Sequence, residues 1–385
     1  MAKSLLLHVG DPKTGTSSIQ KVLFERRWTC ASKVLDYPEV VSSMALANAL
    51  RHDAGPEEAE ELFPPYAFWL EHSKSDVAVI SAEQFSSVDP RKVDETFRKY
   101  FPDLAPSMRV VAYARPHAGR FLSAYAQRVK TGHMTQSLDR FFSEMAQSRI
   151  LLMHQRFSRW RAVFGDRFIL RPMVREELMD GDAVADFINV ALEGAPFEVV
   201  GSTQANISLP IEALAGLRLV QAVLRRAEVR GGTVHAVGDR LSTLVTGRPG
   251  LKGTKVGLNA QLAERLQDAM AADARAMDES FFGKPIMVQA LAAAGKGASE
   301  KAASIEMTDH FRPRPIVKLK RAARELAEEL KANKGLWVRS HRRDKGLKPQ
   351  FVEDSALSAK APEAIAKADK LMGEIAEILF RACSE

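Results

Sequence analysis

The chain has 385 residues and a net charge of +7 at pH 7, and its 46% hydrophobic and 27% charged residues are ordinary for a soluble globular protein. This length allows one large domain with an appendage, or two domains. The two cysteines, Cys30 and Cys383, form no metal-ligand pattern and argue against a disulfide framework.

The apolar runs are short throughout the chain. None approaches the ~20 residues of a membrane span. The run that follows Lys3 is too short for the core of a signal peptide. We therefore expect a cytoplasmic protein in a reducing compartment, without a transmembrane span.

The first predicted elements are a strand, a loop and a helix. An apolar run at Leu5–Val9 ends at a glycine, a loop follows, and a helical pattern extends from Ser17 to Arg27. Thr16 or Ser17 is expected to supply the hydroxyl that caps this helix. Because a helix start offers unpaired N–H groups and partial positive charge, the segment is typical of an anion-binding loop.

The loop differs from the usual nucleoside-triphosphate loop in the place of its lysine. Gly10 and Gly15 keep the spacing of the pattern G-x-x-x-x-G-K-[ST], but Thr16 stands where that pattern has lysine. The lysine of this loop comes earlier, at Lys13. No lysine is left in the usual place to bind a β/γ-phosphate pair.

The next segment is predicted to place a carboxylate at the same edge of a sheet. Helices are expected over 39–52 and 56–72, the second interrupted or bent at Pro64-Pro65. A buried parallel strand is expected at 77–81, with Glu83 just beyond it. Glu83 is either a general base or a glutamate that only complements a helix dipole.

A second possible anion contact follows the next strand. The pattern predicts a helix over 90–101 and a strand over 108–114, after which Arg115 comes at once. Ser123 lies eight residues further on, in a helix that extends to about Lys130. A guanidinium and a hydroxyl at this spacing can bind one phosphate if the helix returns over the strand end. His117, beside Arg115, is a rival general base.

The two motifs resemble those of sulfotransferases that use 3′-phosphoadenosine-5′-phosphosulfate (PAPS). Residues 12–17 resemble the 5′-phosphosulfate loop, and Arg115 with Ser123 resembles the pair that binds the 3′-phosphate. The resemblance covers roughly the first 285 residues. It implies an α/β fold related to P-loop kinases, with a mostly parallel sheet flanked by helices.

The same resemblance implies the roles of individual residues. Lys13 and Glu83 would be catalytic, and the Glu83 role favours a carbohydrate acceptor. The donor site would comprise Lys13, Arg115 and Ser123 together with Thr14, Gly15, Thr16, Ser17 and, in a later segment, Asn206. No metal is implied.

The rest of the chain is predicted to be mostly helical. Helices are expected over 137–164, 174–192, 210–229 and 261–282, with a strand at 167–172 and a mobile Gly-rich loop at 230–257. The domain assignment is a catalytic domain over 1–286, a linker over 287–309 and a basic helical extension over 310–385. Residues 310–348 hold thirteen Lys/Arg against four acids, so the basic character of the chain is concentrated there.

This basic segment has three interpretations. It is a solvated helical face, or it binds an anionic acceptor or membrane surface. We do not expect nucleic-acid binding, because no aromatic residues alternate with the charges.

The sequence thus predicts an enzyme that transfers a sulfuryl group from PAPS to a hydroxyl or amine, with a carbohydrate or small molecule as acceptor. The alternatives are a P-loop kinase and a non-catalytic nucleotide-binding module.

Overall fold

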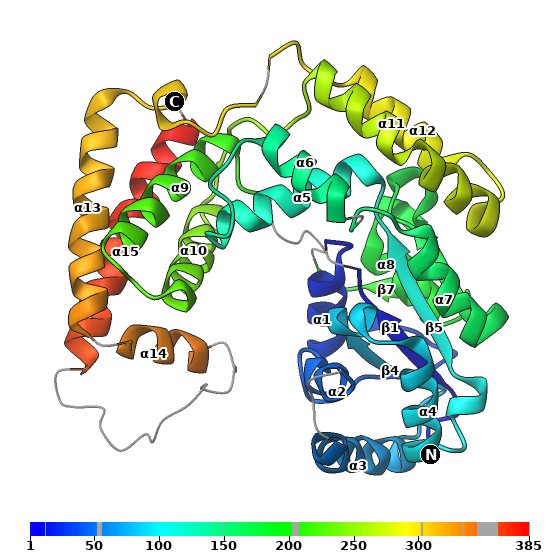
Figure 1. The fold of residues 1–385 in the computed structure, drawn as a ribbon. Coiled ribbons are helices and arrows are strands. Elements are labelled where there is room, and N and C mark those ends of the chain that lie inside the picture. The colour runs from blue at the N-terminus through cyan, green and yellow to red at the C-terminus, as the bar shows by residue number, and fades with distance from the viewer. Residues whose placement is uncertain are drawn as a thin grey trace. The chain divides into compact units, whose positions relative to one another are not determined.

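The structure is a computed structural model that describes residues 1–11, 13–51, 56–148, 150–201, 208–301, 303–333, 335–344 and 361–384. It is an α/β fold with a parallel sheet and a helical C-terminal half, as predicted (Figure 1). Asn206 of the predicted site and Pro12 of the loop motif lie outside the described residues.

Five parallel strands form the main sheet in the order β3-β4-β1-β5-β6. They are β1 (Leu5–Val9), β3 (Leu35–Asp36), β4 (Val77–Ala82), β5 (Arg109–Ala114) and β6 (Phe168–Pro172). From central β1 the chain first builds β3 and β4 on one side and later β5 and β6 on the other. Such a reversal opens a ligand crevice at the carboxyl ends of the central strands.

The sheet is buried on both faces. On one face Leu6, Val79 and Val111 form a core with α1 (Thr16–Phe24) and α8 (Ala183–Ala191). The alternate strand residues, among them Leu7 and Ile80, are fully buried as well. This explains why the strands are continuous apolar runs.

The other elements are mainly helices. They comprise the short antiparallel pair β2 (Trp28–Thr29) and β7 (Glu198–Val199), and α2 (Met44–Ala49), α3 (Pro56–His72), α4 (Pro90–Tyr100), α5 (His117–Lys130), α6 (Leu138–Ser148), α7 (His154–Phe164), α9 (Ile211–Arg226), α10 (Gly231–Thr246), α11 (Ala260–Met277), α12 (Ile286–Lys296), α13 (Pro313–Ala332), α14 (Leu336–Asp344) and α15 (Ala361–Ser384).

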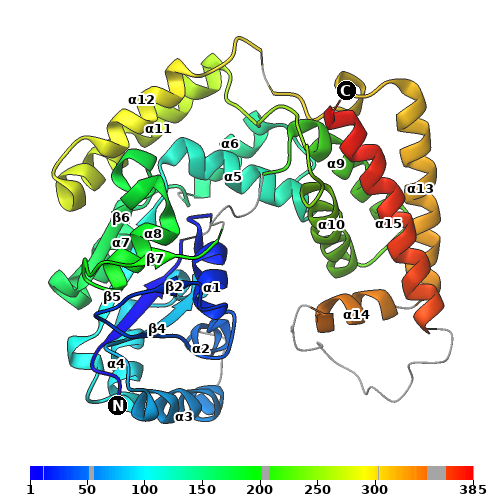
Figure 2. The same ribbon diagram turned by 180° about the vertical axis from the view of Figure 1, so that it is seen from behind.

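The chain forms two compact units, each built from three segments. Unit 1 is Met1–Arg120, Arg149–Ala205 and Arg265–Lys296, and it contains the sheet. Unit 2 is Phe121–Ser148, Asn206–Glu264 and Gly297–Glu385. In unit 2, α9, α13 and α15 pack against one another and α10 packs on α9 and α15 (Figure 2). The functional division at residue 286 stays a prediction.

Three local predictions differ from the structure. Pro64 and Pro65 do not interrupt the helix α3, and a bend there stays a prediction. Both prolines lie on the exposed side of α3, where water reaches the carbonyls that they leave without a donor. The predicted helix at 39–52 is only the short α2. The Gly-rich stretch at 230–257 begins with α10, in which Gly238 is required because a Cβ there would collide with the carbonyl oxygen of Lys130.

The segment predicted as a linker also contains a helix. Residues 287–309 begin inside α12, an alanine-rich helix. Alanine has the highest helix propensity, so the composition that suggested a linker also favours a helix.

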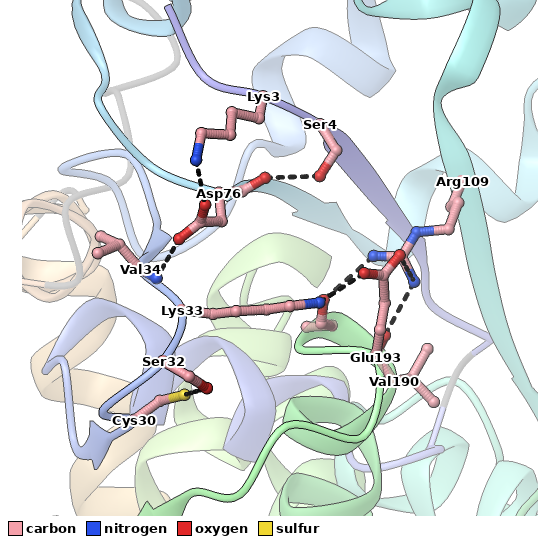
Figure 3. A network of polar contacts seen from close by, with 11 residues as sticks. Lys3, Ser4, Cys30, Ser32, Lys33, Val34, Asp76, Arg109, Val190 and Glu193 are labelled. Atoms are coloured by element: carbon pink, nitrogen blue, oxygen red, sulfur yellow. Dashed lines mark hydrogen bonds and ion pairs between the residues drawn. The ribbon is translucent and has the colours of Figure 1, made fainter.

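A polar network closes the amino ends of the strands, opposite the predicted ligand edge (Figure 3). Lys3 donates to Asp76 at 2.8 Å, and this bond is the main cause that lowers the pKa of Asp76. Lys33 donates to Glu193 at 2.6 Å, and Arg109 lies 3.5 Å from the other oxygen of that carboxylate. The network joins the starts of β1, β4 and β5 to the end of α8.

Candidate functional site

The loop after β1 has its own internal bonds. The N–H of Gly10 donates to the carbonyl of Ala82 at the end of β4 (3.3 Å), and the Thr14 hydroxyl donates to the carbonyl of Asp11 (2.6 Å). Lys13 is exposed and has a left-handed backbone with φ of 69°. A lysine in this region is strained, which is a feature of loops held for a functional reason.

At the start of α1 a hydroxyl has no partner within the described part of the chain. The N-cap is Gly15, with φ of 80° and no side-chain cap bond, so the predicted capping by Thr16 or Ser17 is wrong. Instead, Thr16 is 1% exposed and its Oγ1 has no hydrogen-bond partner among the described residues. Ser17 is exposed on the first turn. An unpartnered buried hydroxyl and the first N–H groups of a helix together favour an anion.

Glu83 lies beside this loop. It follows β4 directly and is half-buried. A Cβ on Gly10 would lie 2.6 Å from Thr16 Oγ1 and 3.0 Å from Glu83 Cγ. The side chains of Thr16 and Glu83 thus leave room for a glycine at this position but not for a larger residue. Burial raises the pKa of Glu83; the charge of Lys13 opposes this effect, and that of Asp11 adds to it. A carboxylate with a raised pKa next to a cation suits a proton acceptor.

Arg115 reaches the loop from β5. Its Nη1 donates to the carbonyl of Lys13 at 3.0 Å, and burial lowers the pKa of its guanidinium. The end of β5 and the loop after β1 therefore meet at the reversal point of the sheet, as predicted from the strand ends. Ser123 lies further along α5 in the stretch that belongs to unit 2, and its role with Arg115 stays a prediction.

Sequence reasoning missed a buried ion cluster behind the loop. Asp11 is 1% exposed, and both Arg120 and Arg156 pair with its carboxylate, the latter at 2.9 Å. Burial lowers the pKa of Arg120 to about 10, although Asp11 opposes the shift, so the side chain stays charged at pH 7. Arg120 lies in the motif that follows Arg115, so its charge could have indicated from the sequence that it contributes to the site. Arg156, on α7, gave no such indication.

His117 has a different environment from Glu83. Its side chain is fully buried, and Nε2 lies 2.8 Å from Asp273 of α11. Asp273 also accepts the N–H groups of Met153 and His154, at 2.9 and 3.1 Å. These bonds join the start of α5 to α7 and α11. The imidazole thus has a structural role in joining these helices.

Comparisons with family models, with curated proteins and with solved structures found no match for this chain. Among the described residues, no group of three or more His, Cys, Asp or Glu side chains is arranged to hold a metal ion. No described helix is both long and apolar enough to cross a membrane.

Proposed function

We propose that the chain is a sulfotransferase that moves the sulfuryl group of PAPS to an acceptor hydroxyl of a carbohydrate. The observation that carries the proposal is the close approach of Thr16 and Glu83 at Gly10, with Lys13 near enough to act on the charge of Glu83. The Thr16 hydroxyl has no hydrogen-bond partner among the described residues. This arrangement combines an anion site with a proton acceptor in one place. The resemblance of the loop supplies the identity of the donor.

In the proposed reaction, Glu83 takes the proton of the acceptor hydroxyl. The acceptor oxygen forms a bond to sulfur while the bond from sulfur to the 5′-phosphate oxygen breaks. The products are a sulfate ester and 3′-phosphoadenosine 5′-phosphate. Lys13 and the N–H groups at the start of α1 stabilise the charge on the transferred group and on the leaving phosphate.

Arg115 has two functions in this proposal. In the described geometry its guanidinium donates to the carbonyl of Lys13 and so supports the strained loop. In the proposed complex it also binds the 3′-phosphate together with Ser123. Binding at both ends fixes the donor for in-line transfer.

The burial of His117 supports Glu83 as the base. The Nε2 of the imidazole is already bonded to Asp273, and its Nδ1 is buried without a partner among the described residues. Glu83 is half-buried and next to Lys13. An acceptor therefore reaches Glu83 with less rearrangement than it needs to reach His117.

A P-loop kinase is the second candidate. Glu83 follows β4, the strand next to β1, and a carboxylate at this place could hold the Mg²⁺ that a kinase needs for phosphoryl transfer. The place of the lysine favours the first candidate, because Thr16 occupies the position of the kinase lysine. The third candidate, a non-catalytic module, predicts nucleotide binding without transfer.

Calorimetry separates these candidates. We expect 3′-phosphoadenosine 5′-phosphate to bind without Mg²⁺ and more tightly than ATP with Mg²⁺. Lys13→Ala should abolish transfer from PAPS, whereas Lys21→Ala, which removes an exposed lysine of the same segment, should not. Tighter binding of ATP with Mg²⁺, or unchanged transfer by Lys13→Ala, would overturn the proposal.

A further inference from the structure

A basic groove lies within unit 2, and none of its lining residues belongs to the proposed sulfuryl-transfer site. It is formed where α9 packs along α13 (Figure 1). Its volume is about 380 Å³. Small-molecule sites are commonly of about this size, 300–1,000 Å³. The lining residues come from one face of each helix, because their spacing follows the helical repeat.

The rim of the groove carries an excess of positive charge. Arg226 of α9 and Lys320, Arg324 and Lys331 of α13 line it, against the single carboxylate of Glu328. All four cations are exposed. Within the described ranges, none of them has a hydrogen bond or an ion pair.

The other acids of α13 have partners elsewhere. Glu325 accepts from Arg321 at 2.8 Å, one turn away on the same helix. Glu329 pairs with Lys367 of α15 at 2.6 Å. The helix therefore pairs these two carboxylates with cations outside the groove, and Glu328 stays the single acid beside four groove cations. Such an arrangement favours an anionic ligand.

The floor of the groove is apolar. Leu219 and Val223 of α9 and Ala227 just beyond it are only partly buried, and Ala327 of α13 closes the floor from the other side. A flat lipid surface does not enter a groove, and a purely polar polyanion gains nothing from an apolar floor. A ligand with an anionic head and a hydrocarbon body matches both parts.

We propose that the α9–α13 groove binds a small amphiphilic anion, with its head between the cations of the two helices and its hydrocarbon body on the Leu219–Val223 floor. This site is independent of the proposed sulfotransferase function. Its ligand is a phosphate, sulfate or carboxylate that carries a short alkyl chain.

The test uses octyl phosphate as the probe, in the full-length chain, by calorimetry below its micelle concentration. Inorganic phosphate reports the head alone, and 1-octanol reports the body alone. We expect octyl phosphate to bind at least about tenfold more tightly than either, since each part contributes on the order of 1.4 kcal/mol or more.

Two double variants with equal charge locate the site. Lys320→Gln with Arg324→Gln should weaken octyl phosphate about tenfold or more. Arg314→Gln with Lys318→Gln, on exposed positions of the same helix outside the groove, should change it by less than about twofold. Thermal unfolding of both variants checks that the helices remain intact.

A third variant tests the floor. Val223→Glu places a carboxylate under the ligand and should weaken octyl phosphate without reducing thermal stability greatly, because the residue is only partly buried. Equal losses in the two double variants would overturn the proposal. Binding of inorganic phosphate as tight as that of octyl phosphate would overturn it as well. Dextran sulfate and phosphatidylserine vesicles serve as probes for a polyanion and a membrane surface, and binding of either one without binding of octyl phosphate would also overturn the proposal.

Discussion

Replacement of Gly10 by alanine tests the close approach at the centre of the proposed site. The added methyl would lie 2.6 Å from Thr16 Oγ1 and 3.0 Å from both Thr16 Cγ2 and Glu83 Cγ. A carbon at 2.6 Å from a buried oxygen must displace it. Overpacking of this kind costs about 1–3 kcal/mol of unfolding free energy.

A control variant separates the cost of the close contact at Gly10 from the general effect of replacing a glycine by alanine. Gly295→Ala, in α12 of the same unit, adds a methyl whose nearest heavy atom lies at 3.6 Å. That variant should be neutral or stabilised by up to about 1 kcal/mol, because alanine favours a helix. Gly10→Ala should therefore be less stable than Gly295→Ala by about 1–4 kcal/mol.

A double-mutant cycle identifies the cause. Thr16→Ala removes both Thr16 atoms that the new methyl meets, so the combination of Gly10→Ala with Thr16→Ala should recover part of the loss. We expect a coupling free energy of about 1 kcal/mol or more from urea unfolding. An uncoupled cycle, or a Gly10→Ala variant as stable as the wild type, would refute the described packing of the loop.

Three other variants test the charged groups. Burial raises the pKa of Glu83, so its contribution to stability is present at low pH and is lost as pH rises; Glu83→Gln should melt no lower than the wild type at pH 7, yet lose about 10²–10⁴-fold in turnover. Burial raises the pKa of Asp273, but the hydrogen bonds from His117 and from two backbone N–H groups outweigh burial, so the pKa is lowered. The stabilisation that Asp273 gives is therefore lost as pH falls below the ordinary Asp pKa of 3.8. Asp273→Asn should flatten this acidic part of a curve of urea midpoint against pH. Asp11→Asn leaves the side chains of Arg120 and Arg156, which are 11% and 21% exposed, without a carboxylate and should cost about 3–5 kcal/mol in urea unfolding. A loss below about 1 kcal/mol would contradict the ion cluster.

The parallel sheet was predictable because its strands carry strong local signals. The strands of 77–81 and 108–114 are apolar runs, and each ends next to a polar residue with a possible role, Glu83 or Arg115. The meeting of these two strand ends with the loop follows from a general property of parallel sheets. The fold class and the strands that border the proposed site therefore needed no homologue.

The supporting contacts were not predictable, since they join residues far apart in sequence. Arg156 reaches Asp11 from α7, and His117 reaches Asp273 from the start of α5. The sequence spacing of Arg156 and of His117 does not indicate which carboxylate each of them contacts. The predicted cap at Thr16 failed for a different reason: Gly15 adopts the left-handed conformation that starts the helix, which frees the threonine hydroxyl.

The three-segment construction of each unit has a consequence for synthesis on the ribosome. Unit 1 has all its segments once Lys296 has emerged, whereas unit 2 still lacks α13 and α15, which form much of its core. From Lys296 to the end of α15 the ribosome adds about 90 residues, which takes on the order of ten seconds. During that interval the apolar sides of α9 and α10 have no permanent cover. The nascent chain thus passes through a stage in which a chaperone has more to bind than at any later time.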